Sequence, residues 1–265
     1  MTIHHQQQQQ QESTSEFVAH VPCDTCGSRD NAALFDDGHT YCFGCAEHVQ
    51  GDAERVSVVP SKAKASQPLL EGDYRPLRKR MLTEETCRKF GYQVGKNSQG
   101  QPVQIATYRD SAGRPVAQKL RTKDKQFSVV GDGKAMTLFG SHLWSKGRKI
   151  VVCEGEIDAC TVSQIQGHKW ATVSIPSGSQ SAKKSLMKAL DYLSNFDEIV
   201  LMFDADEAGQ SAALDCAEAL PIGKVKIATM PLGFKDPNDC MLGGKSAELI
   251  DAIHQANDFR PDGIV

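Results

Sequence analysis

The sequence predicts an α/β protein: a parallel sheet with flanking helices, preceded by a mixed α+β subdomain and by a separate small β ribbon. Three observations support this class. After Gly147, short apolar runs alternate with helical segments, which is typical of a parallel sheet with crossover helices. Before Gly147, a helical segment is followed by a hairpin pattern. Near the N-terminus, paired cysteines surround turn residues and a short strand-like segment.

Composition divides the chain into five predicted regions. A His- and Gln-rich tail, which we expect to be disordered, precedes the ribbon, and a polar linker containing Ser, Lys and Pro separates the ribbon from the globular part. The predicted boundaries are 1–16 for the tail, 17–51 for the ribbon, 52–72 for the flexible linker, 73–148 for a basic α+β subdomain and 149–265 for the parallel sheet with a C-terminal helix.

Size and charge narrow the possible partners. The 265-residue chain is 40% hydrophobic, enough for a real core, and no apolar stretch approaches the length of a membrane span, so we expect no membrane partner. The net charge of −3 is unevenly distributed: residues 73–149 carry 17 basic and 6 acidic side chains, whereas residues 150–265 carry 9 basic and 17 acidic ones. A positive surface beside an acidic one suits a polyanion that lies next to divalent ions.

Two CxxC pairs near the N-terminus predict a zinc site. Each pair places two thiolates on a tight knuckle turn, and a hairpin brings the turns together into the tetrahedral sulfur cage that Zn²⁺ prefers. Disulfides or free thiols are the weaker alternative, because the chain has no secretory signal and its other five cysteines are scattered, as in a reducing cytoplasm. Four thiolates leave no open position, so one structural zinc is expected, held by Cys23, Cys26, Cys42 and Cys45.

Two histidines lie close to the cysteine pairs. His39 and His48 could ligate the metal in principle, but we expect both to be bystanders. His39 opens a short predicted strand that enters the second knuckle, and it is a candidate for contacting whatever the ribbon binds.

The basic subdomain is predicted to begin with a helix that Thr83 caps and that ends at Gly91. A hairpin follows, with strands QIATYRD and PVAQKLRT joined by a turn at 111–113. Along QKLRTKDKQ, which begins in the second arm and continues beyond it, Lys119, Arg121, Lys123 and Lys125 alternate, so an extended strand would place all four on one face.

The second half of the globular part alternates strands and helices. The predicted strands are 149–153, 170–175, 198–204 and 224–229, and the predicted helices are 156–166, 179–194, 207–220 and 246–257. In parallel sheets, sites form beyond the C-terminal ends of the strands.

Carboxylates stand just after two of these strands. Glu154 follows the first strand, and Asp204 and Asp206 end the third. If the two strands are neighbours, the three carboxylates converge at one sheet edge, where they repel one another unless cations lie between them. Such hard oxygen ligands suit Mg²⁺ or Mn²⁺, with one or two ions. The alternative is that Asp204 and Asp206 only cap the helix that follows, which would explain one aspartate but not the whole set.

Ordered motifs identify a family. EGEID followed by DADEAG resembles the Toprim domain of primases, topoisomerases and related nucleases, and a four-cysteine ribbon in front of it narrows the resemblance to primases. The segments PCDTCGS, DGHTYC, LFGSHLW, MFDADEAG, KDPND and PDGIV look like the primase half of the T7-type bacteriophage primase–helicases. The resemblance runs from about Val18 to Val265 and implies a Toprim catalytic subdomain at 149–265.

The resemblance implies roles for individual residues. Glu154 would ligate a metal or act as a base, Asp204 and Asp206 would bind magnesium, and Asp236 would be an outlying acid near the metals. In the basic arm, Lys119 and Lys125 would contact nucleotide phosphates as part of the catalytic site, and Arg121 would help to hold the triphosphate or the template. An exposed basic hairpin explains these lysines equally well from sequence alone. His39 would contact template bases.

The implied activity is that of a DNA primase, which makes short RNA primers on single-stranded DNA from ribonucleoside triphosphates by two-metal phosphoryl transfer. Implied partners are a replicative helicase, fused in the family, and the replicative DNA polymerase, in the host cytoplasm. The chain departs from the family where the helicase would follow, and it has no Walker A motif: Asp239 precedes Gly244-Lys245 where the leading glycine should stand.

Two other functions remain open. One is a Toprim nuclease or topoisomerase, although a topoisomerase needs a tyrosine on a further domain and this chain is short for one. The other is a zinc-ribbon DNA-binding module on an inactive Toprim scaffold, which the intact Glu154, Asp204 and Asp206 disfavour.

Overall fold

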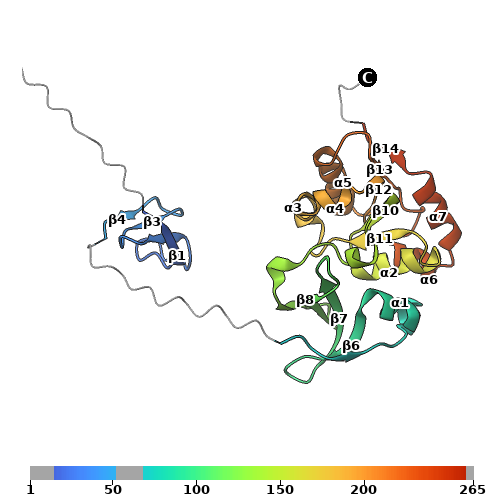
Figure 1. The fold of residues 1–265 in the computed structure, drawn as a ribbon, viewed down its shortest axis with the longest axis horizontal. Helices are drawn as coiled ribbons and strands as arrows, with labels where there is room; N and C mark the ends of the chain where they lie inside the picture. The colour runs from blue at the N-terminus through green and yellow to red at the C-terminus, as the bar shows by residue number, and fades with distance from the viewer. Residues whose placement is uncertain (1–14, 52–67, 261–265) are drawn as a thin grey trace, which may run out of the picture. The chain divides into compact units, whose positions relative to one another are not determined.

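The computed structural model describes residues 15–51 and 68–260, which fall into two compact units, Met1–Ala65 and Ser66–Val265 (Figure 1). Almost all of the predicted tail at 1–16 and most of the predicted linker at 52–72 lie outside the described residues, as does the PDGIV segment at 261–265.

The first unit is a four-stranded antiparallel sheet with the order β1-β2-β3-β4. Its strands are short because turns interrupt the chain on both sides of each cysteine pair. The hairpin of β2 and β3 aligns Ala32 with Cys42, which brings the second cysteine pair next to the first. The strands are β1 (Phe17–Val21), β2 (Ala32–Phe35), β3 (Thr40–Cys42) and β4 (His48–Val49).

The second unit contains the predicted parallel sheet, with the order β11-β10-β12-β13-β14. Strands β10 and β12, the first and third of the predicted series, are direct neighbours and run parallel. The last strand, β14, pairs antiparallel with β13 and is absent from the sequence prediction. The bounds are β10 (Gly147–Cys153), β11 (Ala171–Ser174), β12 (Phe196–Met202), β13 (Val225–Ile227) and β14 (Asn257–Asp258).

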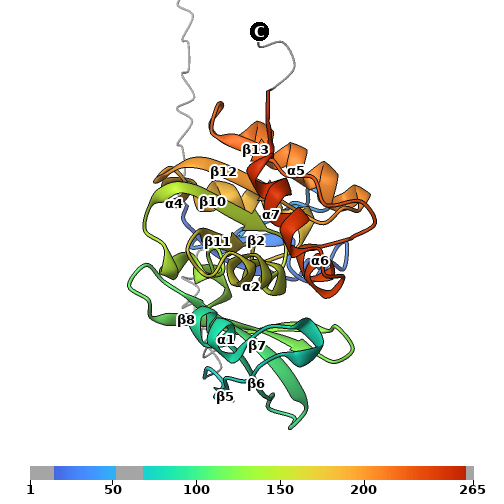
Figure 2. The same cartoon turned by 90° about the vertical axis from the view of Figure 1, so that its right-hand side faces the viewer.

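Helices cover both faces of this sheet because its central strands are apolar on both sides. Val151 and Val200 belong to a core shared with α2, α6 and α7, whereas Ile150 and Ile199 belong to a second core shared with α3, α4 and α5. Figures 1 and 2 show these helices around the sheet. The helices are α2 (Glu156–Ile165), α3 (Ala182–Lys188), α4 (Leu190–Leu193), α5 (Glu207–Ala219), α6 (Pro237–Leu242) and α7 (Ser246–His254).

The basic subdomain is an antiparallel sheet with the order β5-β6-β7-β8-β9 and one α-helix, α1. The Thr83 side chain accepts a hydrogen bond from the Thr86 N–H, which caps α1 as predicted. The elements are β5 (Gly72–Asp73), α1 (Glu84–Phe90), β6 (Tyr92–Lys96), β7 (Pro102–Arg109), β8 (Pro115–Thr122) and β9 (Phe127–Gly131).

The basic subdomain and the parallel-sheet subdomain share a core. Phe90, Tyr108 and Phe139 form an aromatic group that belongs to the same buried cluster as Val151 and Val200. Short 3₁₀ turns connect the elements: η1 (Arg78–Arg80), η2 (Gly133–Ala135), η3 (Ser141–Leu143) and η4 (Ser179–Ser181).

Three local expectations are wrong. The single helix predicted at 179–194 is split into η4, α3 and α4, because Ala189 leaves the helical conformation while Leu186 and Leu193 on either side stay in one core. The last helix ends at His254, since the chain then turns to form β14. Strand β8 ends at Thr122, so the four alternating cations do not lie on one strand face.

None of the helices within 15–51 and 68–260 is long and apolar enough to cross a membrane.

Candidate active site and metal centre

The four predicted zinc ligands come together in the first unit. The sulfur atoms of Cys23 and Cys45 lie 3.7 Å apart, as do those of Cys26 and Cys42. All four sulfurs lie within 4.8 Å of one another. Four thiolates each about 2.3 Å from one zinc ion would have tetrahedral edges of about 3.8 Å, so the observed spacing fits Zn²⁺. Within the described residues, no other group of three or more His, Cys, Asp or Glu side chains has all its ligand atoms within 4.8 Å of one another.

His39 lies outside the sulfur cluster. Its ring stacks on Phe35 with centroids 4.1 Å apart, and its Nδ1 lies 2.5 Å from the Asp37 carboxylate. The His48 ring lies 5.3 Å from the His39 ring. The Asp37 contact fixes the orientation of the imidazole and leaves its other nitrogen available for a ligand.

In the second unit, the predicted carboxylates stand at the C-terminal ends of the neighbouring strands β10 and β12. Glu154 follows Cys153, and its Oε1 accepts a hydrogen bond from the Ser179 N–H at 3.2 Å. Asp204 follows the buried Phe203. Burial raises the pKa of Asp204 to about 6, with further contributions from the negative charges of Glu154 and Asp236. The ionised form of Asp204 is therefore disfavoured by burial and by two neighbouring carboxylates, and a bound cation would relieve this repulsion.

Asp206 has two roles in the structure. Its Oδ1 caps α5 by accepting the Gly209 N–H at 3.0 Å, and its Oδ2 lies 3.0 Å from the ammonium of Lys235. The Gly209 hydrogen bond, followed by the Lys235 contact, lowers the pKa of Asp206. A Cβ atom at Gly209 would lie 2.4 Å from the carbonyl oxygen of Asp204, so only glycine allows this approach.

Asp236 and a buried acid that the sequence analysis missed complete the cluster. The Asp236 Oδ1 caps α6 by accepting the Asp239 N–H at 2.7 Å. The missed acid, Asp158 on α2, accepts the Asn238 N–H at 3.2 Å. Burial, followed by the charges of Asp236 and Asp204, raises the pKa of Asp158 well above its usual range. Its position four residues after Glu154 was the available sequence signal.

Lys119 is held by another acid that the sequence analysis missed. Its Nζ lies 2.8 Å from Glu156 and donates to the Pro176 carbonyl at 3.0 Å. Glu156 also accepts a hydrogen bond from the Tyr108 hydroxyl at 2.6 Å. The guanidinium of Arg121 lies 5.6 Å from the Phe127 ring. The predicted lysine thus belongs to a buried hydrogen-bonded group.

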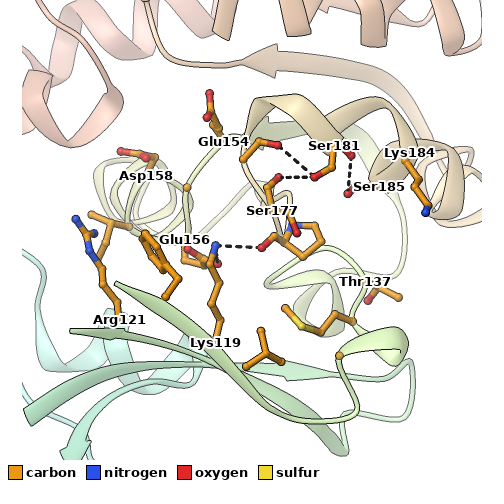
Figure 3. A pocket seen from close by; sticks show the side chains of 18 of the residues that line it. Lys119, Arg121, Thr137, Glu154, Glu156, Asp158, Ser177, Ser181, Lys184 and Ser185 are labelled. Carbon is orange, nitrogen blue, oxygen red and sulfur yellow. Dashed lines mark hydrogen bonds and ion pairs between the residues drawn. The ribbon is translucent and has the colours of Figure 1, made fainter. Parts of the chain in front are cut away.

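Acids and cations of the second unit line one cavity of about 1150 Å³ (Figure 3). Glu154, Asp158 and Asp204 lie along the end formed by β10, α2 and β12, and Lys119 and Arg121 come from β8. Asp206, Asp236 and Lys125 are not among the lining residues; Lys125 lies instead in the β8–β9 turn with φ 60°. Carboxylates gathered on an open cavity are a donor set that fits a hard divalent cation.

Comparison with known proteins identifies related sequences. Residues 72–131 match the family described as Bacteriophage T7 DNA helicase/primase, N-terminal a+b fold, and residues 151–241 match the family described as Toprim-like. A DNA helicase/primase of Enterobacteria phage T3 is 40% identical over 96% of this chain and 46% of its own length. The chain therefore spans about half the length of this curated relative.

Solved structures give the same result. The primase fragment of the bacteriophage T7 primase–helicase is 41% identical, with a TM-score of 0.67, covering 90% of this chain and 100% of the other. A bacteriophage T7 lagging-strand DNA polymerase structure contains primase domains bound to an RNA/DNA hybrid and dTTP. Its matching chain is 44% identical, with a TM-score of 0.67, covering 71% of this chain and 94% of the other. This chain belongs to the family of the T7-type bacteriophage primase–helicases.

Proposed function

We propose that this chain is a DNA primase: a DNA-templated RNA polymerase that makes short RNA primers on single-stranded DNA from ribonucleoside triphosphates. The observation that carries the proposal is the cavity of the second unit, where carboxylates from the ends of β10 and β12 face cations from β8. Family membership supports the same activity.

Glu154, Asp204 and Asp206 would hold one or two magnesium or manganese ions, with Asp236 as an outlying acid. When bound, these ions activate a 3′-hydroxyl and neutralise the charge of the departing pyrophosphate. The Ser179 N–H orients Glu154, and Asp204 lines the cavity beside it. Lys119, Arg121 and Lys125 would bind phosphates of the nucleotide or the template, which positions the reacting groups.

The cysteine ribbon would hold one structural zinc and read the template. His39, whose ring is already oriented by Asp37 and Phe35, would contact exposed base edges of single-stranded DNA. The remaining proposed partners are a replicative helicase and the replicative DNA polymerase, and the proposed location is the host cytoplasm. The T7 polymerase structure that contains primase domains supports the polymerase as a partner.

Primer synthesis on a panel of single-stranded DNA templates, with four ribonucleotides and magnesium, tests the proposal. We expect the wild-type protein to make short RNA products and Asp204→Asn to make none. Asp197→Asn is the matched control, because Asp197 is an exposed acid at the opposite end of the same strand. Strand cleavage of the DNA without RNA synthesis would instead identify a nuclease, and DNA binding without either reaction would identify a binding module.

A further inference from the structure

One face of α3 lines the cavity with side chains that the proposed chemistry has not used. Ser181 directly precedes this helix. The lining residues Lys184, Ser185 and Lys188 follow it after three, four and seven residues, so all of them share one helix face. The opposite face carries Leu186, which is buried in the core beneath the sheet. Two residues of the segment after β9 join them. This set, called the α3 wall, consists of Lys134, Thr137, Ser181, Lys184, Ser185 and Lys188.

Lys184 is the available cation of the helix itself. The Lys188 ammonium already donates to the carbonyl oxygens of Lys134 and Met136, the latter at 2.8 Å, which fastens α3 to the segment after β9. Lys184 is exposed, and within 15–51 and 68–260 it makes no ion pair or side-chain hydrogen bond. In Figure 3 it lies near Thr137, on the side of the cavity away from Asp158.

The cavity is electrically divided. The carboxylates of Glu154, Glu156, Asp158 and Asp204 line one end together with Lys119 and Arg121 of β8, whereas the α3 wall carries lysines and no acid. A polyanion without a metal ion is repelled from the acidic end and attracted to the wall. The volume of about 1150 Å³ also lies above the roughly 300–1,000 Å³ that is typical of a pocket for one drug-sized ligand.

We propose, resting on the proposed primase function, that the α3 wall binds the triphosphate of the initiating nucleotide, which becomes the 5′ end of the primer. In the first condensation, the 3′-hydroxyl oxygen of this nucleotide forms a bond to the α-phosphorus of the second nucleotide. The bond from that phosphorus to its bridging oxygen breaks, pyrophosphate leaves and the hydroxyl proton passes to water. The initiating nucleotide keeps all three of its phosphates in this reaction. Because the carboxylates repel these phosphates, they need lysines in another part of the cavity to bind them.

The test compares Lys184→Gln with Lys183→Gln. Lys183 is the adjacent lysine of α3; it is exposed and is not among the residues that line the cavity, so the control removes the same charge from the same helix. The assay extends a template-bound RNA dinucleotide by one ribonucleotide. The dinucleotide carries either a 5′-triphosphate or a 5′-hydroxyl group.

We expect Lys184→Gln to raise the KM for the triphosphate dinucleotide about 5- to 20-fold, as for loss of one charge-assisted hydrogen bond. The KM values for the 5′-hydroxyl dinucleotide and for the incoming ribonucleotide should stay unchanged, and Lys183→Gln should change none of them. If Lys184→Gln raises the KM of the incoming ribonucleotide instead, or behaves like Lys183→Gln, the inference is overturned.

A second measurement separates this inference from the proposed function. Binding of inorganic tripolyphosphate is measured by calorimetry in magnesium-free buffer. Weaker binding by Lys184→Gln than by Lys183→Gln supports a triphosphate site on the α3 wall even if the wild-type protein makes no primers, an outcome that would refute the proposed function alone. Equal binding by the two variants overturns the inference whatever the result of the primer assay.

Discussion

At the scale of single residues, the acids of the candidate site combine capping with ligand chemistry. Asp206 uses one oxygen to cap α5, and its other oxygen faces the Lys235 ammonium. Asp236 likewise caps α6 through one oxygen. A carboxylate can accept a backbone hydrogen bond on one oxygen and bind a cation with the other. The two interpretations that the sequence left as alternatives, helix caps and metal ligands, are therefore compatible.

Asp204→Asn should raise the melting temperature of the metal-free protein at neutral pH. The folded pKa of Asp204, about 6, lies above the ordinary value of 3.8, so the folded state holds its proton more tightly and the ionised form carries a penalty above about pH 6. Because the group is partly solvated, we expect the gain to be on the order of 1 kcal/mol. This gain in stability from Asp204→Asn should shrink as the pH falls from 6 to 4, because Asp204 of the wild-type protein then becomes protonated. Thermal melting in magnesium-free buffer at several pH values checks this.

Magnesium provides the control for that prediction. Saturating magnesium should stabilise the wild-type protein more than Asp204→Asn, because the ion relieves the repulsion that the substitution removes. An Asp204→Asn variant that melts below the wild type at pH 7.5 without magnesium would contradict the proposed repulsion.

Lys119→Met should destabilise the second unit by about 2–4 kcal/mol, because it leaves Glu156 buried with only Tyr108 as its partner. Adding Glu156→Gln should restore part of this loss, since the uncompensated charge is then gone. Urea unfolding of the two single variants and the double variant measures the coupling. If the single and double variants lose the same stability, the Lys119–Glu156 pair does not carry the effect.

At the scale of elements, the hairpin of β8 and β9 decides which cations share a surface. The Thr122 side chain accepts the Gln126 N–H at 3.1 Å, and Lys125 adopts a left-handed conformation, so the chain reverses immediately after Thr122. Lys119 and Arg121 remain on one face of β8 and line the cavity. Lys123 and Lys125 belong to the turn.

Lys125→Ala should raise the apparent KM for ribonucleotides or lower turnover in primer synthesis without changing zinc content. The reason is that a turn lysine beside β8 can reach a phosphate from outside the cavity lining. Lys96→Ala is the control, because Lys96 is an exposed lysine of β6 in the same sheet. If both variants have the same KM and turnover, the phosphate role assigned to Lys125 by family resemblance is wrong.

At the scale of the whole second unit, one buried asparagine links the basic subdomain to the parallel-sheet subdomain. Asn238 donates to the Arg80 carbonyl oxygen at 2.9 Å and to the Thr161 hydroxyl at 3.0 Å, and it accepts from the Arg80 guanidinium at 3.0 Å. Its backbone N–H also donates to Asp158. The link therefore runs beside the acid cluster.

Asn238→Ala should lower the free energy of unfolding by about 2–3 kcal/mol, because it removes the hydrogen bonds that the buried Asn238 side chain makes to Arg80 and to the Thr161 hydroxyl. Asn257→Ala, at an exposed position of β14, should change it by less than about 0.5 kcal/mol. Urea unfolding followed by circular dichroism compares them. Equal losses for the two variants would show that the Asn238 hydrogen bonds do not stabilise the fold.

Cys42→Ser should release zinc and abolish template-directed priming while the second unit keeps its melting transition. The grounds are that the four sulfurs lie in the first compact unit and that the second unit has its own cores. Zinc analysis and calorimetry on the same sample measure both effects. Protein purified without chelator that contains no stoichiometric zinc would contradict the zinc assignment, and loss of the second melting transition would contradict the independence of the units.

The sequence by itself determined the features that depend on local spacing. Two CxxC pairs predict four sulfurs in one place, and the structure brings them within 4.8 Å of one another. Alternating apolar strands and helices predict the parallel sheet, and they place Glu154 and Asp204 at its C-terminal edge. Each of these results follows from a short-range rule: a knuckle turn, or the shared direction of parallel strands.

Only the tertiary structure decided what depends on contacts between distant segments. Glu156 and Asp158 look like ordinary residues at the start of a helix, and their importance arises because Tyr108, Lys119 and Asn238 reach them from other elements. The break at Ala189 is equally invisible, since it carries no strong local signal. Burial and long-range partners set these positions, and spacing along the chain does not encode them.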